Sequence, residues 1–286
     1  MSRAVLFVLW LLHWLPLPLL RAAGAALGVL LHAVAGARRR AAQTNLRLCL
    51  PELSNSERAR LVRLAVRHFS QSVVDRALLW HSSAERLCRL ITLQGAEHLQ
   101  VQEGKPVILL APHFTGMDAA WTRLTLLRKM AGTYARQTNP VFDAALYRGR
   151  TRFNGALALA RQDGVRAPLR ALSNGLPLYY LPDLDFGALG AVFVPFFGVP
   201  AATVTAVSRM ARISGAAVLP VVTRMTRDGY VVTIHPPWKN FPGASDDADA
   251  RFMNTFIEQE VRANPGQYHW LHKRFKTRPP GAPPVY

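Results

Sequence analysis

The chain is poor in cysteine and in acidic residues, and each shortage narrows what the protein can be. Only 2 of the 286 residues are cysteines, Cys49 and Cys88, which excludes a disulfide framework and a cysteine-rich zinc site. The 17 Asp and Glu residues face 35 Lys and Arg residues, giving a formal net charge of +18. This imbalance predicts an acidic partner, and charge alone leaves an anionic membrane, nucleic acid and an acidic carrier protein open.

Motifs for cofactor binding are also missing from the sequence. There is no G-x-G-x-x-G fingerprint, no P-loop and no zinc-ligand spacing, so we expect neither a cofactor nor a metal. Hydrophobic residues, in contrast, make up 50% of the chain. A packed core is therefore expected and extensive disorder is not.

The N-terminus carries a long uncharged run. Residues 4–20 contain no charge, and Arg21 and an Ala/Gly/Leu-rich stretch lead from there to the cluster Arg38, Arg39 and Arg40. As a helix, residues 4–20 would span roughly 25 Å at about 1.5 Å per residue, near the lower limit for a bilayer. We expect residues 1–40 to form a single-pass or embedded anchor in the cell inner membrane, with the arginine cluster holding the following domain on the cytoplasmic side. A cleaved signal peptide and a buried hairpin are the alternatives.

Beyond residue 40, apolar runs alternate with helical patterns. We expect strands at residues 106–111, 132–137, 178–181, 191–196, 216–224 and 230–234, the last two paired, and helices at 57–79, 119–130, 140–152, 165–173, 204–213 and 248–263. This alternation predicts an α/β fold with a mixed central sheet flanked by helices. The main domain is expected over residues 41–278, and the proline-rich residues 279–286 are expected not to pack.

The stretch VILLAPHFTGMD, residues 107–118, brings a histidine and an acid to the end of a buried run. On one continuous helix His113 and Asp118 would point about 140° apart, but HFTG allows a bend that starts a helix near Asp118. Asp118 could then accept the Nδ1 proton of His113 and leave Nε2 as a general base. The same spacing recurs at His98 and Glu103, in a polar stretch typical of a solvated helix face. His113, in contrast, lies at a strand-to-helix turn, where α/β proteins commonly place functional sites. This position favours His113 as the catalytic residue, and the alternative is a core or loop histidine.

Five segments in order resemble a known family. GKPVILLAPHFTGMD resembles the H-x4-D/E block of the glycerolipid acyltransferase superfamily, and more specifically that of the bacterial lipid A late acyltransferases of the lauroyl/myristoyl type. Four further segments are similar to blocks of that family: NPVFDAALYRGRTRFN (139–154), YYLPDLDFGALGAVFVPFFG (179–198), AVLPVV (217–222) and NPGQYHWLHKRFKTRP (264–279). Each motif is modest alone, but the ordered set covers most of the chain.

The resemblance implies a glycerolipid-acyltransferase-like fold and transfer of a fatty acyl group from a thioester to a glycolipid hydroxyl. The implied partners are acidic acyl carrier protein as donor, an anionic glycolipid acceptor of the lipid A pathway and membrane phospholipids, with no nucleic acid. His113 would be the base, oriented by Asp118, with no acyl-enzyme. The same transfer onto an ornithine lipid or a glycosylated phosphatidylinositol remains open, as does a non-enzymatic, membrane-tethered binder of anionic polymers.

The second and third blocks supply the expected substrate-binding residues. Arg150 is expected to hold an acceptor phosphate or the oxyanion, with Arg148 beside it, because a guanidinium can bind a phosphate through two hydrogen bonds. Asp183 and Asp185 are expected to anchor these arginine head groups. Arg136 completes the set.

Two positions depart from the family pattern. Asp118 stands where the late lipid A members usually have glutamate. Ala135 follows Tyr134 where the family usually has arginine, so that Arg136 is shifted by one position. Both departures bear on the identity of the acceptor rather than on the reaction.

Overall fold

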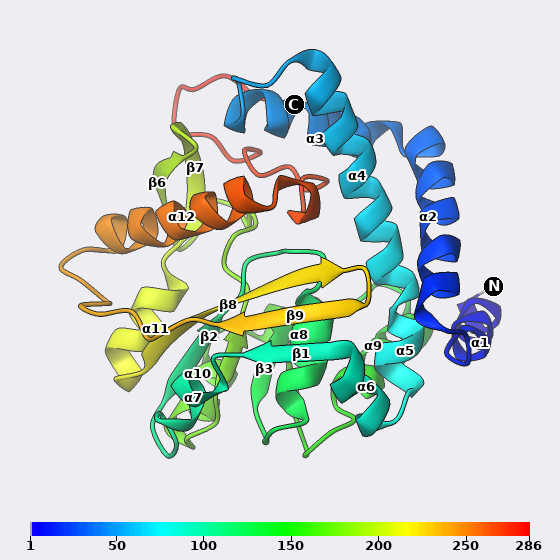
Figure 1. The fold of residues 1–286 in the computed structure, drawn as a ribbon. Coiled ribbons are helices and arrows are strands. Elements are labelled where there is room, and N and C mark those ends of the chain that lie inside the picture. The colour runs from blue at the N-terminus through cyan, green and yellow to red at the C-terminus, as the bar shows by residue number, and fades with distance from the viewer. Residues whose placement is uncertain (1) are drawn as a thin grey trace.

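A seven-stranded sheet lies at the centre of the computed structural model, which describes residues 2–286 (Figure 1). The strand order is β1-β9-β8-β2-β5-β3-β4, and every neighbouring pair is parallel except β8 and β9. The strands are β1 (Ile91–Gln94), β2 (Val107–Leu110), β3 (Ala131–Tyr134), β4 (Leu157–Ala160), β5 (Leu178–Tyr180), β8 (Ala217–Thr226) and β9 (Gly229–Ile234). The expected α/β class with a mixed sheet is confirmed.

Strand β2 is buried on both faces because its side chains alternate between two hydrophobic cores. Val107 and Leu109 face one core, and Ile108 and Leu110 face the other. Each such side chain stabilises the fold by about 1.5–3 kcal/mol when fully buried. The strand is therefore a rigid base for the residues that follow it.

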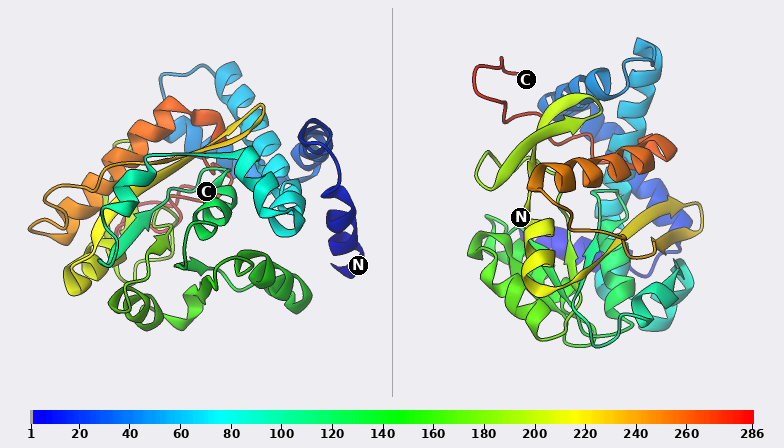
Figure 2. Two further views of the ribbon diagram at one scale, coloured as in Figure 1. Left: turned by 60° about the horizontal axis from the view of Figure 1, so that its bottom comes forward. Right: turned by 90° about the vertical axis from the view of Figure 1, so that its left-hand side faces the viewer.

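Helices cover both faces of the sheet. The core that contains Val107 is formed with α1 (Ser2–Leu12), α2 (Leu17–Val34), α5 (Arg76–His81), α6 (Ala84–Leu90), α7 (Ala96–Gln100), α8 (Met117–Thr125) and α9 (Pro140–Arg150). The other core is formed with α3 (Gly36–Cys49), α4 (Asn55–Val74), α10 (Arg166–Ser173), α11 (Ala206–Ser214) and α12 (Asp246–Ala263). The two further views show the same layered arrangement (Figure 2).

A separate hairpin packs beside α12. It consists of β6 (Ala191–Phe196) and β7 (Val199–Val204). Elsewhere in the chain, short 3-10 helices occur at η1 (Arg161–Asp163) and η2 (Pro265–Gln267). Phe197 and Gly198 make the turn with φ of 51° and 77°. Glycine adopts this left-handed region without a steric penalty, which explains the FFG of the third block.

The helix expected over residues 57–79 is broken in the structure. Ser54 caps α4 in a capping box with Glu57. However, α4 ends at Val74 and α5 begins at Arg76. The break falls at Asp75, whose buried carboxylate pairs with Arg21 (Nε to Oδ2, 3.0 Å) and accepts a hydrogen bond from the Tyr230 hydroxyl (2.5 Å).

The two ends of the chain differ from expectation. Helix α3 runs without a break through residue 40, where the anchor was expected to end. The prediction that residues 279–286 do not pack is wrong, because the Tyr286 hydroxyl accepts a hydrogen bond from the Phe275 amide (3.1 Å) and donates one to Asn45. Among residues 2–286, α2 is the one helix whose length and composition would allow it to cross a membrane.

Candidate active site

The candidate site lies where the parallel strands end. His113 follows β2, Asp183 follows β5, Tyr134 closes β3 and Arg161 follows β4. Strands β2, β5, β3 and β4 run parallel, so their carboxyl ends meet at one edge of the sheet, where α/β proteins commonly bind ligands.

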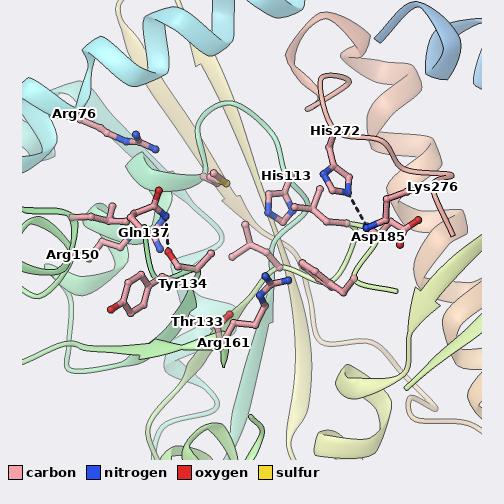
Figure 3. Close-up of a pocket in the computed structure, with 16 residues that line it drawn as sticks. Arg76, His113, Thr133, Tyr134, Gln137, Arg150, Arg161, Asp185, His272 and Lys276 are labelled. Atoms are coloured by element: carbon pink, nitrogen blue, oxygen red, sulfur yellow. Dashed lines mark hydrogen bonds between the residues drawn. The ribbon is translucent and has the colours of Figure 1, made fainter. Parts of the chain in front are cut away.

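His113, Tyr134 and Arg161 line a cleft of about 460 Å³ (Figure 3). One part of its lining is polar and rich in positive charge: Arg76, His113, Thr133, Tyr134, Gln137, Arg150, Arg161, Asp185, His272 and Lys276. The remainder is apolar: Met117, Ala135, Leu146, Leu181, Leu184 and Phe186. Such a lining suits a ligand that has both an anionic part and a hydrocarbon part.

His113 is held by Asp183 and not by Asp118. Its Nδ1 lies 2.6 Å from Oδ1 of Asp183, and its backbone amide donates to Oδ2 of the same carboxylate at 2.9 Å. The side chain of Asp183 is fully buried, and that of His113 is 12% exposed. Burial would raise the pKa of Asp183, but the charge and hydrogen bonds of His113 outweigh it and lower the pKa below the ordinary value.

The prediction that Asp118 accepts a hydrogen bond from Nδ1 of His113 is therefore wrong. Asp118 does lie in the first turn of α8, as predicted. Its carboxylate instead binds Arg150 (Oδ1 to Nη2, 2.5 Å) and Arg76 (Oδ2 to Nη2, 3.1 Å). The turn after His113 explains the difference, since α8 starts so that its first residues point toward α5 and α9, which carry these two arginines.

The two guanidiniums keep Asp118 ionised. Burial disfavours its charge, but Arg150 and Arg76 outweigh that effect and hold the pKa of the carboxyl far below its usual range. A single carboxylate thus fixes two cationic side chains at the edge of the cleft.

The expectation that Asp183 and Asp185 anchor arginines is also wrong. Asp183 accepts its hydrogen bonds from the backbone and the imidazole of His113. Asp185 accepts hydrogen bonds from the amide (2.6 Å) and hydroxyl (2.7 Å) of Thr277, and its own amide donates to Nε2 of His272 (3.1 Å). The two acids of the D-x-D motif therefore face different partners.

Of the three arginines expected at the site, the structure brings one into the cleft. Arg150 lines it. Arg148 points instead into a separate groove of about 260 Å³ that it shares with Leu6 of α1 and Trp80 of α5. Arg136 is exposed and pairs with Asp163 at 3.1 Å, outside the cleft lining.

The C-terminal segment, residues 264–278, closes over the histidine. The His269 amide donates to the His113 carbonyl (3.0 Å), and the Thr115 amide donates to the Gln267 carbonyl (2.9 Å). The Tyr268 side chain lies near Asp183 and contributes to lowering the pKa of that carboxyl. Burial, aided by the nearby His113, lowers the pKa of His269 to about 3 and that of His272 to about 4, so that both imidazoles are neutral at pH 7.

Sequence reasoning missed several residues of the cleft. Arg161 follows an apolar patch, residues 156–160, and reading that patch as a strand would have placed Arg161 at the edge of the sheet. Lys276 and His272 lie in the segment 264–279, in which basic and aromatic residues alternate and no single residue stands out. Arg76 had no local signal, because it is one arginine among many in a helical stretch.

The sequence comparisons with known proteins lead to lipid A biosynthesis acyltransferases. The sequence model of the family described as "Bacterial lipid A biosynthesis acyltransferase" matches residues 2–277. The lipid A biosynthesis lauroyltransferase of Escherichia coli (strain K12) is 35% identical, over 98% of this chain and 92% of that protein. The palmitoleoyltransferase of the same strain is 32% identical over the same shares. The myristoyltransferase is 35% identical over 85% of this chain and 76% of that protein.

A likeness is also found among solved structures. The 1-acyl-sn-glycerophosphate acyltransferase PlsC from Thermotoga maritima aligns with a TM-score of 0.40 and 14% identity, covering 84% of this chain and 96% of that one.

Proposed function

The chain belongs to the bacterial lipid A biosynthesis acyltransferase family, and from that premise we propose that it moves a fatty acyl group from acyl carrier protein to a hydroxyl of a lipid A precursor. The reaction takes place at the cytoplasmic face of the inner membrane. The net charge of +18 supports both an acidic carrier protein as donor and an anionic glycolipid as acceptor.

One observation carries the mechanism: the 2.6 Å contact between His113 Nδ1 and Asp183, beside a cleft with cationic and apolar lining residues. Asp183 fixes the tautomer with a proton on Nδ1, so that Nε2 can accept the proton of the acceptor hydroxyl. The hydroxyl oxygen attacks the thioester carbonyl as that proton leaves, and the departing thiolate then takes the proton back from Nε2. Asp183 stabilises the imidazolium between these two steps.

The arginines at the cleft act on negative charge. Arg150 and Arg76, both held by Asp118, are placed to stabilise the thioester oxygen as it becomes negative or to bind an acceptor phosphate. Arg161 and Lys276 add positive charge to the lining. In this proposal the acyl group passes directly to the acceptor without an acyl-enzyme, because His113 activates the acceptor hydroxyl itself and no nucleophile of the protein is needed.

The decisive test is the His113→Gln variant, assayed with acyl carrier protein and coenzyme A thioesters and a purified lipid A precursor. General-base catalysis is worth about 10²–10⁴ in rate, so a loss of this size is expected. His98→Gln is the matched control, because His98 has the same spacing to an acid but lies on α7, outside the cleft. Equal activity of both variants contradicts the proposal.

Two further measurements separate the remaining possibilities. Intact mass of the protein after incubation with donor alone should show no covalent acyl adduct. Mass analysis of the host's lipids after deletion of the gene should show lipid A lacking one secondary acyl chain. Unchanged lipid A with altered ornithine lipids or glycosylated phosphatidylinositols would move the acceptor to those lipids.

A further inference from the structure

Helix α2 could cross a membrane by length and composition, but it packs along the side of α4 (Figure 1). A Cβ added to Gly24 would lie 2.6 Å from Cα of Gln71, and one added to Gly28 would lie 3.0 Å from Cα of Arg67. The two helices therefore run antiparallel with their backbones close together. This contact leaves no room for side chains larger than hydrogen at these two positions.

The start of α2 is fastened by polar groups. Arg21 pairs with the buried Asp75 (3.0 Å) and donates to the Gly229 carbonyl (3.3 Å). Gln71 donates to the Arg21 carbonyl (3.0 Å). If α2 moved away from α4, Asp75 would lose a charged partner inside the protein, which is strongly unfavourable.

Helix α4 is unsuited to the hydrocarbon layer. It carries the exposed residues Arg60, Arg63 and Arg67, for which the structure of residues 2–286 contains no salt bridge. Gly28 lies against Arg67, so an α2 that crossed the bilayer would take this part of α4 with it. Arginine is costly at the bilayer centre, and a spanning α2 is thus incompatible with the observed packing.

The side of α2 that faces away from α4 is uncharged. Its exposed large hydrophobic residues are Leu19, Val29, Leu30 and Val34. Helix α1, which is 11 residues long and too short to span, exposes Val5, Phe7, Val8, Trp10 and Leu11. The exposed Trp14 follows in the connection to α2. Both helices lie at the same edge of the molecule in Figure 1 and in the left view of Figure 2.

We propose that α1 and α2 lie in the plane of one leaflet of an anionic bilayer and do not cross it. Their exposed apolar side chains enter the acyl layer, as in other interfacial helices. Arg3, Arg38 and Arg40 are exposed near the two ends of this surface and meet the lipid phosphates. A second copy of the chain is a poor occupant, because each copy carries a net charge of +18.

Cysteine labelling tests the sidedness. The background is Cys88→Ser, in which the remaining Cys49 is buried and its raised thiol pKa keeps it unreactive. Ser2→Cys and Lys105→Cys are added separately, the second on an exposed turn of the catalytic domain. A membrane-impermeant maleimide is applied to inside-out inner-membrane vesicles and to spheroplasts, with intact mass to verify that residue 2 is retained.

An in-plane arrangement predicts that both positions react in inside-out vesicles to the same extent before and after detergent. Reaction of Ser2→Cys only after detergent, while Lys105→Cys reacts before it, would overturn the proposal, as would loss of the N-terminal residues. If both positions reacted only in spheroplasts, the in-plane arrangement would stand and the cytoplasmic location proposed above would fail.

Vesicle flotation tests whether an anionic bilayer is the partner of this surface. Full-length protein should float with vesicles of phosphatidylethanolamine and phosphatidylglycerol, and Trp10→Glu combined with Val29→Glu should reduce the floated fraction about tenfold. Ile213→Glu is the control, since Ile213 is 71% exposed on α11 and outside this surface. Undiminished flotation of the double variant would overturn the proposal. So would a wild-type protein that forms a dimer in solution and does not float.

Discussion

The two sides of the cleft use a buried carboxylate in opposite ways. On the histidine side, defined by His113 and Asp183, one acid serves one imidazole. On the arginine side, defined by Asp118, Arg76 and Arg150, one acid joins two guanidiniums. The labelled partners lie on either side of the cleft in Figure 3. Both carboxylates have a lowered pKa, so burial and charge do not distinguish their roles. The roles differ because Asp183 binds a histidine and Asp118 binds two arginines.

The largest expected effect is on the histidine side. Asp183→Asn removes the charge that stabilises the imidazolium and places an amide beside Nδ1, where the wrong tautomer of His113 is then favoured. We expect kcat to fall by roughly 10³–10⁴ with KM changed little. Steady-state kinetics measures this, and a variant that keeps a tenth of the wild-type kcat would contradict the role of Asp183.

The arginine side should respond differently. Asp118→Asn leaves Arg76 and Arg150 as neighbouring positive charges without their shared partner. We expect a loss of roughly 2–4 kcal/mol in the free energy of unfolding, together with a rise in acceptor KM that exceeds the fall in kcat. Urea unfolding and kinetics test both, and equal kcat losses for Asp118→Asn and Asp183→Asn would remove the distinction between the two sides.

Lowering the pH should reduce the free energy of unfolding in two different pH ranges, one set by His269 and one by Asp118. His269 has a pKa lowered from 6.5 to about 3, so the unfolded chain binds its proton first and stability is lost as the pH falls below 6.5. Asp118 has a lowered pKa, so its contribution is lost only as the pH falls below its ordinary value of about 4. Urea unfolding between pH 7 and 3 should show that His269→Gln reduces the loss of unfolding free energy in the upper window by roughly 1 kcal/mol per pH unit, and that Asp118→Asn reduces the loss in the lower window.

The smallest effect is expected outside both sides. Arg136 and Asp163 form an exposed pair, with side chains 52% and 55% exposed, and such pairs contribute about 0–1 kcal/mol. Arg136→Ala should therefore change kcat/KM by less than about threefold. Arg161→Ala, which removes a cation from the cleft itself, is the comparison, and it should reduce kcat/KM substantially more.

The sequence predicted the strands and helices better than it predicted which side chains of the site contact one another. Buried runs such as residues 106–111 identified strands because hydrophobic patterns reflect burial along the chain itself. The bend after His113 and the position of Asp118 in the first turn of α8 were also predicted correctly.

The pairing of the acids could not be read from local spacing. Asp183 lies 70 positions from His113, and Arg76 lies 42 positions before Asp118. These contacts depend on the order of strands in the sheet and on the break at Asp75. A pattern of neighbouring residues carries no information on either, so the nearest acid was assigned to the histidine and the distant one to the arginines.

The C-terminal segment has a consequence for the timing of biogenesis. Residues 264–278 hold the backbone at His113 and Thr115, yet they leave the ribosome after every strand of the sheet, while α1 and α2 emerge first. With α1 and α2 bound to lipid as proposed above, a nascent chain would reach the lipid surface long before His113, the proposed base, is fixed. Translation products that stop short of this segment would accumulate at the bilayer without being able to modify it.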